Sequence, residues 1–528
     1  MTHAHLIGGG IASLSAAVYL IRDAGMPGEH VHIYEYLGLP GGSLDGSGSA
    51  ADGFMIRGGR MFEEHFGCTF DLLDGIPTLG GAGQSVAAEI KQFTADVRPS
   101  SRCRLVVDGQ RCEAPAFQLK LGDKLKLLLL SQQPESALQG KTIEQYFGAH
   151  FFSTNFWAMW CTMFAFQPWH SVVEMRRYMR RFMHLLPGFN RLEGIYRTRL
   201  NQYDSIVRPV VHWPEEQGVN IHLNCTVNDL SFDTSLGTVT GIHFEPGTAC
   251  SDITTSSDDL VFITLGSMTE DSSLGSMSTP PQERSQTAPH CGAWPLWRRI
   301  AARSKHFGRP DVFAGNVEQT RWLSFTVTLD NARFFEFMEN FTGNSPGTGG
   351  LVTFKHSGWL TSVVLAHQPH FSGQPEGTYV FWGYGLRPER NGDHINKPML
   401  QCSGTEILAE LAYQLELGAA AREMFASANC IPCLMPHITT QFMPRSKGDR
   451  PSVIPAESRN FAFIGQYVEL PDDTVFTVEY SVRSAQTAVY NLCATQKRPT
   501  PLFRGYLRPG IVGRALSCIL NNGPPPRI

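Results

Sequence analysis

The chain has 528 residues, of which 42% are hydrophobic and 17% are charged. This length and apolar content predict a folded protein with a large core and more than one domain, and they exclude a chain that is disordered by default. The 44 Lys and Arg residues face 48 Asp and Glu residues, which gives a formal net charge of -4. Because no global positive field exists, we expect no nucleic-acid partner.

The first residues run almost directly into an apolar segment and a glycine turn. The sequence MTHAHLIGGG has no basic stretch, long apolar run or cleavage site of a secretory signal. We therefore expect a cytoplasmic protein. The twelve cysteines are scattered without the spacing of a disulfide scaffold, so free thiols in a reducing compartment are expected.

Two cysteines in CxxC spacing, Cys430 and Cys433, stand near His437. They could form half of a zinc site. No second CxxC follows at metal spacing, so structural cysteines are the favoured interpretation and we expect no metal.

The stretch 149–173 carries no Asp, Glu, Lys or Arg and is rich in Phe, Trp and Met. A bilayer core requires about 20 predominantly apolar residues. Polar residues and a proline interrupt this run, so we reject a membrane-spanning helix. The segment FWAMWCTMFAF suits an acyl channel, but the same residues could be plain core.

The pattern of apolar residues predicts an α/β organisation. Residues 5–36 predict a strand, a glycine turn, a helix with apolar spacing near 3.6 and a second strand. A second mixed region, 201–266, predicts a helix near NQYDSIVRPVV, alternating strands through 219–244 and the buried strand LVFITLG. The segment 269–289, rich in Ser, Thr and Pro, predicts an exposed connection.

The first glycine turn has the pattern of a dinucleotide-binding site. Gly8, Gly10 and Ser13 occupy the positions of G-x-G-x-x-G/A with a small third residue. Such glycines permit a close approach to a pyrophosphate, which the helix N-terminus stabilises. Glu35, at the end of the second strand, can accept a hydrogen bond from a ribose hydroxyl. A turn that serves packing alone is the alternative, and the glycine-rich PGGSLDG directly after Glu35 argues against it.

A late segment favours FAD over NAD. The sequence NFAFIGQYVELPDDTVFTVEYSVRSAQTAVYNL predicts a strand ending at Gly465, a loop, and a helix capped near Ser481. In flavoproteins of the glutathione-reductase type a late strand, loop and helix return to the flavin, so this assignment is an analogy of fold. The predicted cofactor-binding residues are Gly8, Gly10, Ile11, Ala12, Ser13, Glu35, Gly42, Ser43, Arg60, Met61, Val227, Gly465, Phe476 and Ser481.

Several long motifs together resemble one family, the oleate hydratases, once called myosin-cross-reactive antigens. The matching runs include LIGGGIASLSAAVYLIRDAG, GFMIRGGRMFEEHFGCTFDLL, FWAMWCTMFAFQPWHSVVEMRRYMRRF and FMPRSKGDRPSVIP, in order along most of the chain. The resemblance implies an FAD-dependent hydro-lyase that adds water to the cis-9 double bond of oleate and related long-chain fatty acids, giving 10-hydroxy products.

Two departures from the family pattern stand out. Where its best-known members carry RGGREM, with the Glu regarded as activating water, this chain has Met61. The family's Thr-x-Asn-x-x-x-His stretch appears here as Val364, Ala366 and His370, so only the histidine is kept. The chain is also short at its N-terminus compared with many dimeric members, which favours a divergent, monomeric branch.

The expected fold is a Rossmann-type, glutathione-reductase-like FAD-binding domain with a mixed α+β substrate domain and a short C-terminal helical segment. The predicted boundaries are 1–45, 201–292 and 452–497 for the FAD-binding domain, 46–200 and 293–451 for the substrate-binding region, and 498–528 for the C-terminal segment. Arginines among apolar residues in this last segment could make transient contact with an anionic membrane, although a solvated tail is favoured.

The resemblance assigns the proton donor to Tyr178, on a predicted helix. For an arbitrary tyrosine, a hydroxyl bonded to backbone would be favoured instead. The neighbouring arginines, Arg176, Arg177, Arg180 and Arg181, could stabilise partial negative charge or the fatty carboxylate, although most such arginines face solvent or pair with acids.

In place of the missing family Glu, Glu63 and Glu64 rank equally for positioning water, and either could be an ordinary surface acid. His370 could orient the substrate carboxylate or a water, or be structural. Two other classes of function stay open: a flavin-dependent isomerase or oxidoreductase, and a lipid-binding flavoprotein without catalysis.

Overall fold

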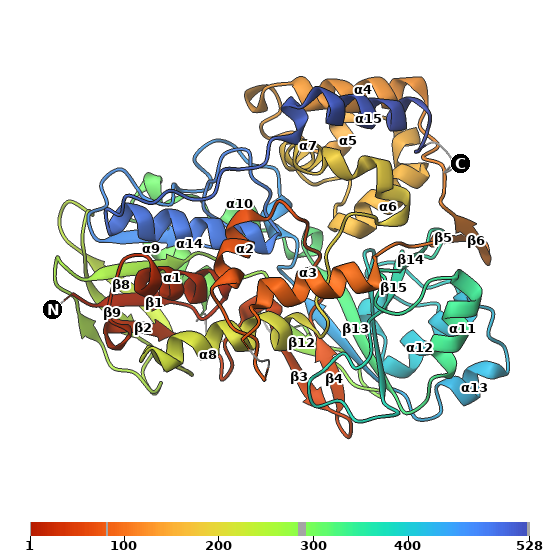
Figure 1. Cartoon of the computed structure of the whole chain (residues 1–528), viewed down its shortest axis with the longest axis horizontal. Helices are drawn as coiled ribbons and strands as arrows, with labels where there is room; N and C mark the ends of the chain where they lie inside the picture. The colour runs from red at the N-terminus through yellow and green to blue at the C-terminus, as the bar shows by residue number, and fades with distance from the viewer. Residues whose placement is uncertain (1, 81–82, 284–291, 525–528) are drawn as a thin grey trace.

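The computed structural model describes residues 2–80, 83–283 and 292–524, and a parallel sheet forms one side of the molecule (Figure 1). Its strands, in spatial order, are β18 Phe461–Ile464, β11 Leu260–Thr264, β1 Ala4–Ile7, β2 Val31–Tyr34 and β7 Asn220–His222. Every neighbouring pair is parallel. This is the predicted Rossmann-type sheet, assembled from segments far apart in the sequence.

Helices α1 Ile11–Arg22 and α14 Val478–Leu492 pack against each other beside this sheet (Figure 1). Ten consecutive residues of α1, from Ile11 to Leu20, are buried, which explains why its sequence is apolar on every face. Helix α8 Arg208–Glu216 follows one π-turn at 203–207 and confirms the predicted helix near NQYDSIVRPVV. Strands β8 Val227–Phe232, β9 Val239–Phe244 and β10 Ile253–Thr254 form a small antiparallel sheet.

An eight-stranded sheet forms a second layer (Figure 1, lower right). Its order is β12 Ser273–Leu274, β17 Asn429–Met435, β13 Trp322–Leu329, β16 Tyr379–Gly385, β15 Thr361–Leu365, β14 Leu351–Phe354, β5 Cys103–Val107 and β6 Gln110–Glu113. All pairs are antiparallel except β14 with β5. Helices α11 Arg333–Thr342 and α12 Gly404–Gln414 share a separate apolar core with this sheet. The mixed α+β region is therefore confirmed.

A helical group lies at the edge above this sheet (Figure 1). It consists of α4 Leu121–Gln132, α5 Ile143–Tyr146, α6 Asn155–Phe164, α7 Val172–Arg181 and α15 Pro509–Leu520. Within the described residues no helix is both long and apolar enough to cross a bilayer. The favoured reading of the C-terminal segment as a solvated tail is wrong, because α15 packs on residues 183–191 and buries Ala515, Cys518 and Ile519.

The remaining elements connect these layers. They are the hairpin β3 Gly46–Ser49 and β4 Gly53–Ile56, and the helices α2 Gly67–Asp74, α3 Val86–Val97, α9 Ala293–Ala301, α10 Asp311–Ala314 and α13 Ala420–Met424. Helix α9 packs on β8, and β12 pairs with β17. Both contacts cross the predicted boundary at 292, and the division into domains stays a prediction.

Two expectations are corrected by tertiary contacts. Cys225 and Cys250 form a disulfide, so these two cysteines are not free thiols. The predicted connection 269–289 is more than a loop, because Ser273 and Leu274 pair with β17 and Gly275 donates a backbone hydrogen bond to Pro432, although Leu274 is exposed as expected. The part of that connection after Glu283 lies outside the described residues.

Candidate cofactor pocket and catalytic site

The fingerprint turn lies between the end of β1 and the start of α1. Gly8 has φ +95° and faces the Thr264 side chain, which an added Cβ would approach to 3.2 Å. A Cβ on Gly9 would come within 2.7 Å of Glu35 Oε2. The tight turn therefore requires glycine at both positions. The N-terminus of α1 has no side-chain cap at Gly10, which leaves its N–H groups directed toward the space in front of the helix.

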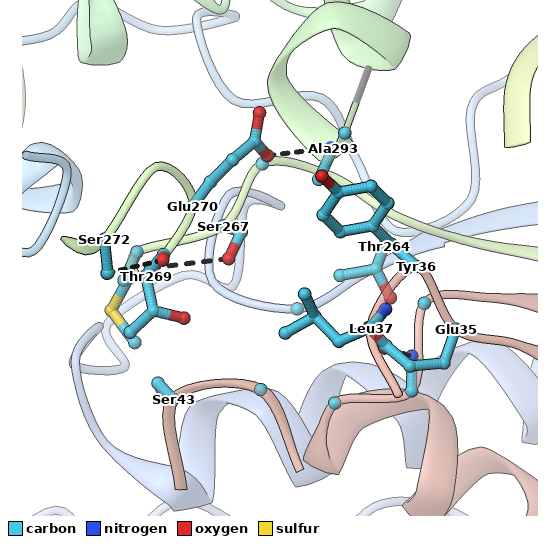
Figure 2. Close-up of a pocket in the computed structure, with 18 of the residues that line it drawn as sticks. Glu35, Tyr36, Leu37, Ser43, Thr264, Ser267, Thr269, Glu270, Ser272 and Ala293 are labelled. Atoms are coloured by element: carbon cyan, nitrogen blue, oxygen red, sulfur yellow. Dashed lines mark hydrogen bonds between the residues drawn. The ribbon is translucent and has the colours of Figure 1, made fainter. Parts of the chain in front are cut away.

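A cavity of about 690 Å³ opens in front of this turn (Figure 2). Of the predicted cofactor-binding residues, ten line it: Gly8, Gly10, Ile11, Ala12, Glu35, Gly42, Ser43, Val227, Gly465 and Ser481. Four do not: Ser13, Arg60, Met61 and Phe476. Ser13 instead lies inside the helix packing, where its Oγ is 3.2 Å from Thr264 Oγ1. Ser481 lies in the first turn of α14, whose cap is Thr477 rather than the predicted Ser481.

Glu35 is fixed at the end of β2 by two backbone hydrogen bonds. Gly9 N donates to its Oε2 over 2.5 Å, and Leu37 N donates to its Oε1 over 2.8 Å. Burial raises the pKa of Glu35, and these hydrogen bonds oppose the rise. The carboxylate is thereby held at the pocket wall, with lone pairs left for a ribose hydroxyl.

The far wall of the pocket comes from residues that the sequence prediction missed. Thr264 ends β11, and Ser267, Thr269 and Glu270 follow this strand; all four line the pocket (Figure 2). The rule that ligands bind at the carboxyl ends of parallel strands could have found Thr264 and Ser267. Glu270 carries no such signal: its Oε2 accepts from Ala293 N at 2.8 Å, at the start of α9. Burial raises the pKa of Glu270 to about 7.

Arg60 and Phe476 lie together behind Ser43. The Arg60 guanidinium stacks 5.0 Å from the centre of the Phe476 ring, and Arg60 Nη2 donates to Ser43 O over 3.4 Å. Burial lowers the pKa of Arg60 to about 10. This pair therefore links the 57–62 loop to the pocket wall without lining the cavity.

Tyr178 lies on α7, as predicted, and is 2% exposed. Its hydroxyl donates to Val475 O over 2.6 Å, directly before Phe476 in the chain. Burial and the nearby Glu174 carboxylate hold the pKa of Tyr178 well above its usual value, while Arg60 opposes this rise. The hydroxyl is therefore protonated at neutral pH, and its proton is bonded to Val475 O.

The arginines around Tyr178 all have partners. Arg176 and Arg177 both bind Glu135, and Arg177 also binds Glu469. Arg181 pairs with Glu63, and Arg180 donates to Ser131 O. Of the two readings for this cluster, pairing with acids and backbone is the one that the contacts favour.

The two candidate acids after Met61 have different surroundings. Glu63 is buried, with His65 Nδ1 at 2.9 Å and His184 Nε2 at 3.3 Å from its Oε2. Burial alone would raise the pKa of Glu63, but His184, His65 and Arg181 lower it to about 2. The Glu64 side chain is 61% exposed. Glu63, His65 and His184 lie close enough to hold a metal ion.

His370 lies in a second cavity, of about 50 Å³. Arg197, Trp382 and Gly59 also line it, and so do Val364 and Ala366, the two family positions that have changed. Within the described residues, His370 Nδ1, Arg197 Nε and Trp382 Nε1 are buried and have no hydrogen-bond partner. Burial lowers the pKa of His370 to about 4. The cavity thus offers unpaired donors to an anion, and Arg197 and Trp382 were missed because no local motif marks them.

The aromatic helix and the CxxC pair belong to the packing. Residues of α6 are buried in the main core and line neither cavity, which favours the reading as plain core. Cys430 and Cys433 lie on opposite faces of β17, in different apolar cores, so they do not converge on one ion.

The chain is similar in sequence to two proteins named as fatty-acid hydratases. The chain is 40% identical to an "Oleate hydratase" of Streptococcus pyogenes serotype M49 (strain NZ131) over 502 residues, which cover 92% of this chain and 84% of that protein. It is 32% identical to a "Linoleate hydratase" of Lactiplantibacillus plantarum, with 92% of each chain covered.

Solved structures match at the level of the fold. A double mutant of putrescine oxidase has a TM-score of 0.55 at 13% identity, with 93% of this chain and 99% of that chain covered. The wild-type putrescine oxidase gives 0.54. The family model described as "MCRA family" matches residues 1–490. The chain therefore belongs to the MCRA family.

Proposed function

We propose that this protein is an FAD-dependent hydro-lyase that adds water to the cis-9 double bond of oleic acid and related unsaturated fatty acids, giving 10-hydroxy fatty acids. The observation that carries the proposal is the identity to two hydratases over 92% of the chain. Membership of the family over residues 1–490 supports it.

The large cavity fits FAD. An open helix N-terminus suits a pyrophosphate, the fixed Glu35 carboxylate suits a ribose, and Gly465 and Ser481 extend the lining toward a second helix. Hydration changes no oxidation state overall, so bound FAD would supply fixed charge and order for the 58–61 loop rather than net electron transfer.

Tyr178 is the proposed proton donor. An isolated alkene has no neighbouring carbonyl to stabilise developing charge, so protonation must be concerted with attack of water or supported by preorganised charge. The charge of the buried Arg60 guanidinium lowers the pKa of Tyr178, so Arg60 is well suited to stabilise the phenolate that forms. The hydrogen bond to Val475 O has to break in the step.

For the fatty carboxylate we propose the cavity of His370. The Arg197 guanidinium and the Trp382 indole offer unpaired buried donors there. Buried donors bind anions strongly because they give up no hydrogen bond to water when the anion binds. They would replace the Thr and Asn that the family pattern carries at Val364 and Ala366. Water is then positioned from the 61–65 loop, with Glu63 and Glu64 as candidates. The buried Glu63 is ionised and paired with Arg181, whereas the side chain of Glu64 is exposed.

The test is incubation of purified, FAD-loaded protein with oleate in oxygen-18 water, followed by mass spectrometry. We expect 10-hydroxystearate that carries one heavy oxygen. A hydroxy acid without label, or no hydroxy acid, contradicts the proposal. Substrate-dependent bleaching of the flavin under anaerobic conditions would instead support an oxidoreductase or isomerase, to which the putrescine oxidase fold is also suited.

We further propose that the protein acts as a monomer in the cytoplasm. Sedimentation equilibrium at micromolar concentration tests the proposed monomer. A stable dimer would contradict this part without affecting the catalytic proposal.

A further inference from the structure

Two histidines converge on one carboxylate oxygen of Glu63. His65 Nδ1 lies 2.9 Å and His184 Nε2 lies 3.3 Å from Glu63 Oε2, and the three ligand atoms all lie within 4.8 Å of one another. His65 stands two residues after Glu63, whereas His184 comes from the 3₁₀ segment Met183–Arg191 that follows α7. The other carboxylate oxygen, Oε1, is taken by Arg181 Nη1 at 2.8 Å. Oε2 is therefore the atom that both imidazoles face.

Hydrogen bonding alone leaves this cluster incomplete. His65 Nδ1 can donate to Glu63 Oε2, but within the described residues neither ring nitrogen of His184 makes a hydrogen bond. The His184 side chain is only 9% exposed. Buried polar groups are almost always paired, so this imidazole requires a partner that the neighbouring side chains do not supply.

The spacing of the three ligand atoms matches a tetrahedral metal site. Zn²⁺ binds imidazole nitrogen and carboxylate oxygen at about 2.0 to 2.2 Å, which places neighbouring ligand atoms about 3.3 Å apart. The two distances to Glu63 Oε2 lie close to this value. Two imidazoles and one carboxylate form a donor set that suits Zn²⁺, whereas Mg²⁺ and Ca²⁺ prefer oxygen ligands alone.

The surroundings of the cluster suit a bound cation. The Phe503 ring stacks on His65 with 3.5 Å between ring centres and meets His184 edge-on at 5.1 Å, so it shields one side of both imidazoles. Glu64 Oε1 lies 3.8 Å from His65 Nδ1. The carboxylates of Glu63 and Glu64 thus outnumber the single Arg181 guanidinium beside them, and the local charge favours a cation.

We propose that Glu63, His65 and His184 bind one Zn²⁺ ion, with the fourth position open to water or to Glu64. The Nδ1 proton of His65 would leave to solvent as the ion binds, because the ligand nitrogen must be deprotonated. The ion would join the loop 57–65 to the segment after α7 and so fix the position of that loop. The proposal goes beyond the proposed function, and it requires no turnover.

The experiment is calorimetric titration of the full-length, untagged, FAD-loaded protein with Zn²⁺, after treatment with EDTA and dialysis. We expect one equivalent to bind in the micromolar range or tighter and to raise the melting temperature. Co²⁺ as a second probe should give the absorption bands of a tetrahedral site at wavelengths longer than those of flavin. His65→Gln and His184→Asn should each weaken Zn²⁺ binding at least about 100-fold, since even the outer partners of metal ligands contribute about 10- to 100-fold.

The matched control is His150→Asn. His150 binds a single carboxylate, Asp123, at 2.8 Å, and no third ligand joins them among the described residues, so this variant should bind Zn²⁺ as the wild type does. His65 is 26% exposed, so His65→Gln should fold even if His184→Asn does not, and circular dichroism checks both. Failure of the wild type to bind Zn²⁺, or binding that His65→Gln retains in full, overturns the proposal.

Discussion

Glu63 and Arg181 form a buried ion pair, with 2.8 Å between Oε1 and Nη1. Both side chains are at most 2% exposed, and His65 and His184 complete the surroundings of the carboxylate. Arg181 stands one helical turn after Tyr178, and Glu63 stands two residues after Met61. The pair therefore fixes the loop that carries Arg60 to the helix that carries the proposed proton donor.

Replacing Glu63 by Gln should destabilise the protein by about 3 kcal/mol, because a buried guanidinium loses its charge partner. Chemical denaturation monitored by circular dichroism measures the free energy of unfolding. Glu64→Gln is the matched control: this exposed neighbour should change stability by no more than about 0.5 kcal/mol. Equal effects of the two substitutions would mean that the ion pair contributes nothing specific.

Tyr178→Phe should lower kcat for oleate hydration at least about 100-fold, since positioned general acids contribute about 10² to 10⁴. The lost hydrogen bond to Val475 O should cost only about 1 kcal/mol of stability. Tyr480→Phe removes a similar hydrogen bond, from a buried hydroxyl to Val468 O at 2.7 Å, together with the one that this hydroxyl accepts from Leu470 N, and should keep activity. Full turnover by Tyr178→Phe would exclude the phenol as proton donor.

Part of this architecture could be predicted from local sequence. The β1 turn, α1 and the late strand and helix each lie within one segment, so hydrophobic period and glycine spacing suffice to find them. Glu270 and the disulfide could not be found in this way. Glu270 joins the pocket by capping α9, which starts 23 residues later, and Cys225 meets Cys250 only through the β8–β9–β10 sheet.

The catalytic candidates show the same contrast. The family motif identifies Tyr178 and His370, but the partners that determine their chemistry come from distant segments: Val475 for the hydroxyl, and Arg197 and Trp382 for the histidine cavity. Equal ranking of Glu63 and Glu64 was the most that sequence could support, since burial alone separates them.

Stacked histidines at one face of the parallel sheet predict loss of stability in mild acid. The rings of His5 and His32 lie 5.5 Å apart, and those of His32 and His222 lie 5.8 Å apart. Burial, with repulsion from the other histidines, lowers the pKa of His5 and of His32 from 6.5 to about 4, although Asp259 opposes the shift at His5. The unfolded state thus binds these protons more strongly than the folded state.

The contribution of the neutral His5 and His32 to the free energy of unfolding is therefore complete above pH 6.5, and it is lost as the pH falls from 6.5 toward 4. For the largely buried His5 the loss should reach about 3 kcal/mol at most. Urea denaturation at half-unit steps between pH 7.5 and 4.5 measures it. His5→Asn should flatten the slope in this window, and an unchanged slope would show that other groups control the acid sensitivity.

The Cys225–Cys250 disulfide should stabilise the protein by about 3 kcal/mol, as estimated from the 25-residue separation of its cysteines. Cys250→Ser, or a reducing agent, should lower the melting temperature. Because Cys225 lines the large cavity, we also expect weaker FAD binding, measured by flavin fluorescence. Cys112→Ser, which alters a free, partly exposed cysteine, should change neither property. If mass spectrometry of the native protein finds both thiols free, the prediction fails.

Arg197→Met tests the anion-binding role of the second cavity. Arg197 Nε is buried without a partner, and among the described residues its guanidinium makes one long hydrogen bond, 3.4 Å from Nη2 to Gly349 O. Removing the guanidinium should therefore cost the protein little hydrogen bonding. Binding of a carboxylate should weaken more, because it loses one charge-assisted hydrogen bond. We therefore expect KM for oleate to rise at least about tenfold, with a smaller change in kcat. Methyl oleate, which lacks the charge, should be hydrated equally by the wild type and the variant. If KM for oleate stays unchanged while kcat falls, Arg197 acts on the reacting centre and the carboxylate binds elsewhere.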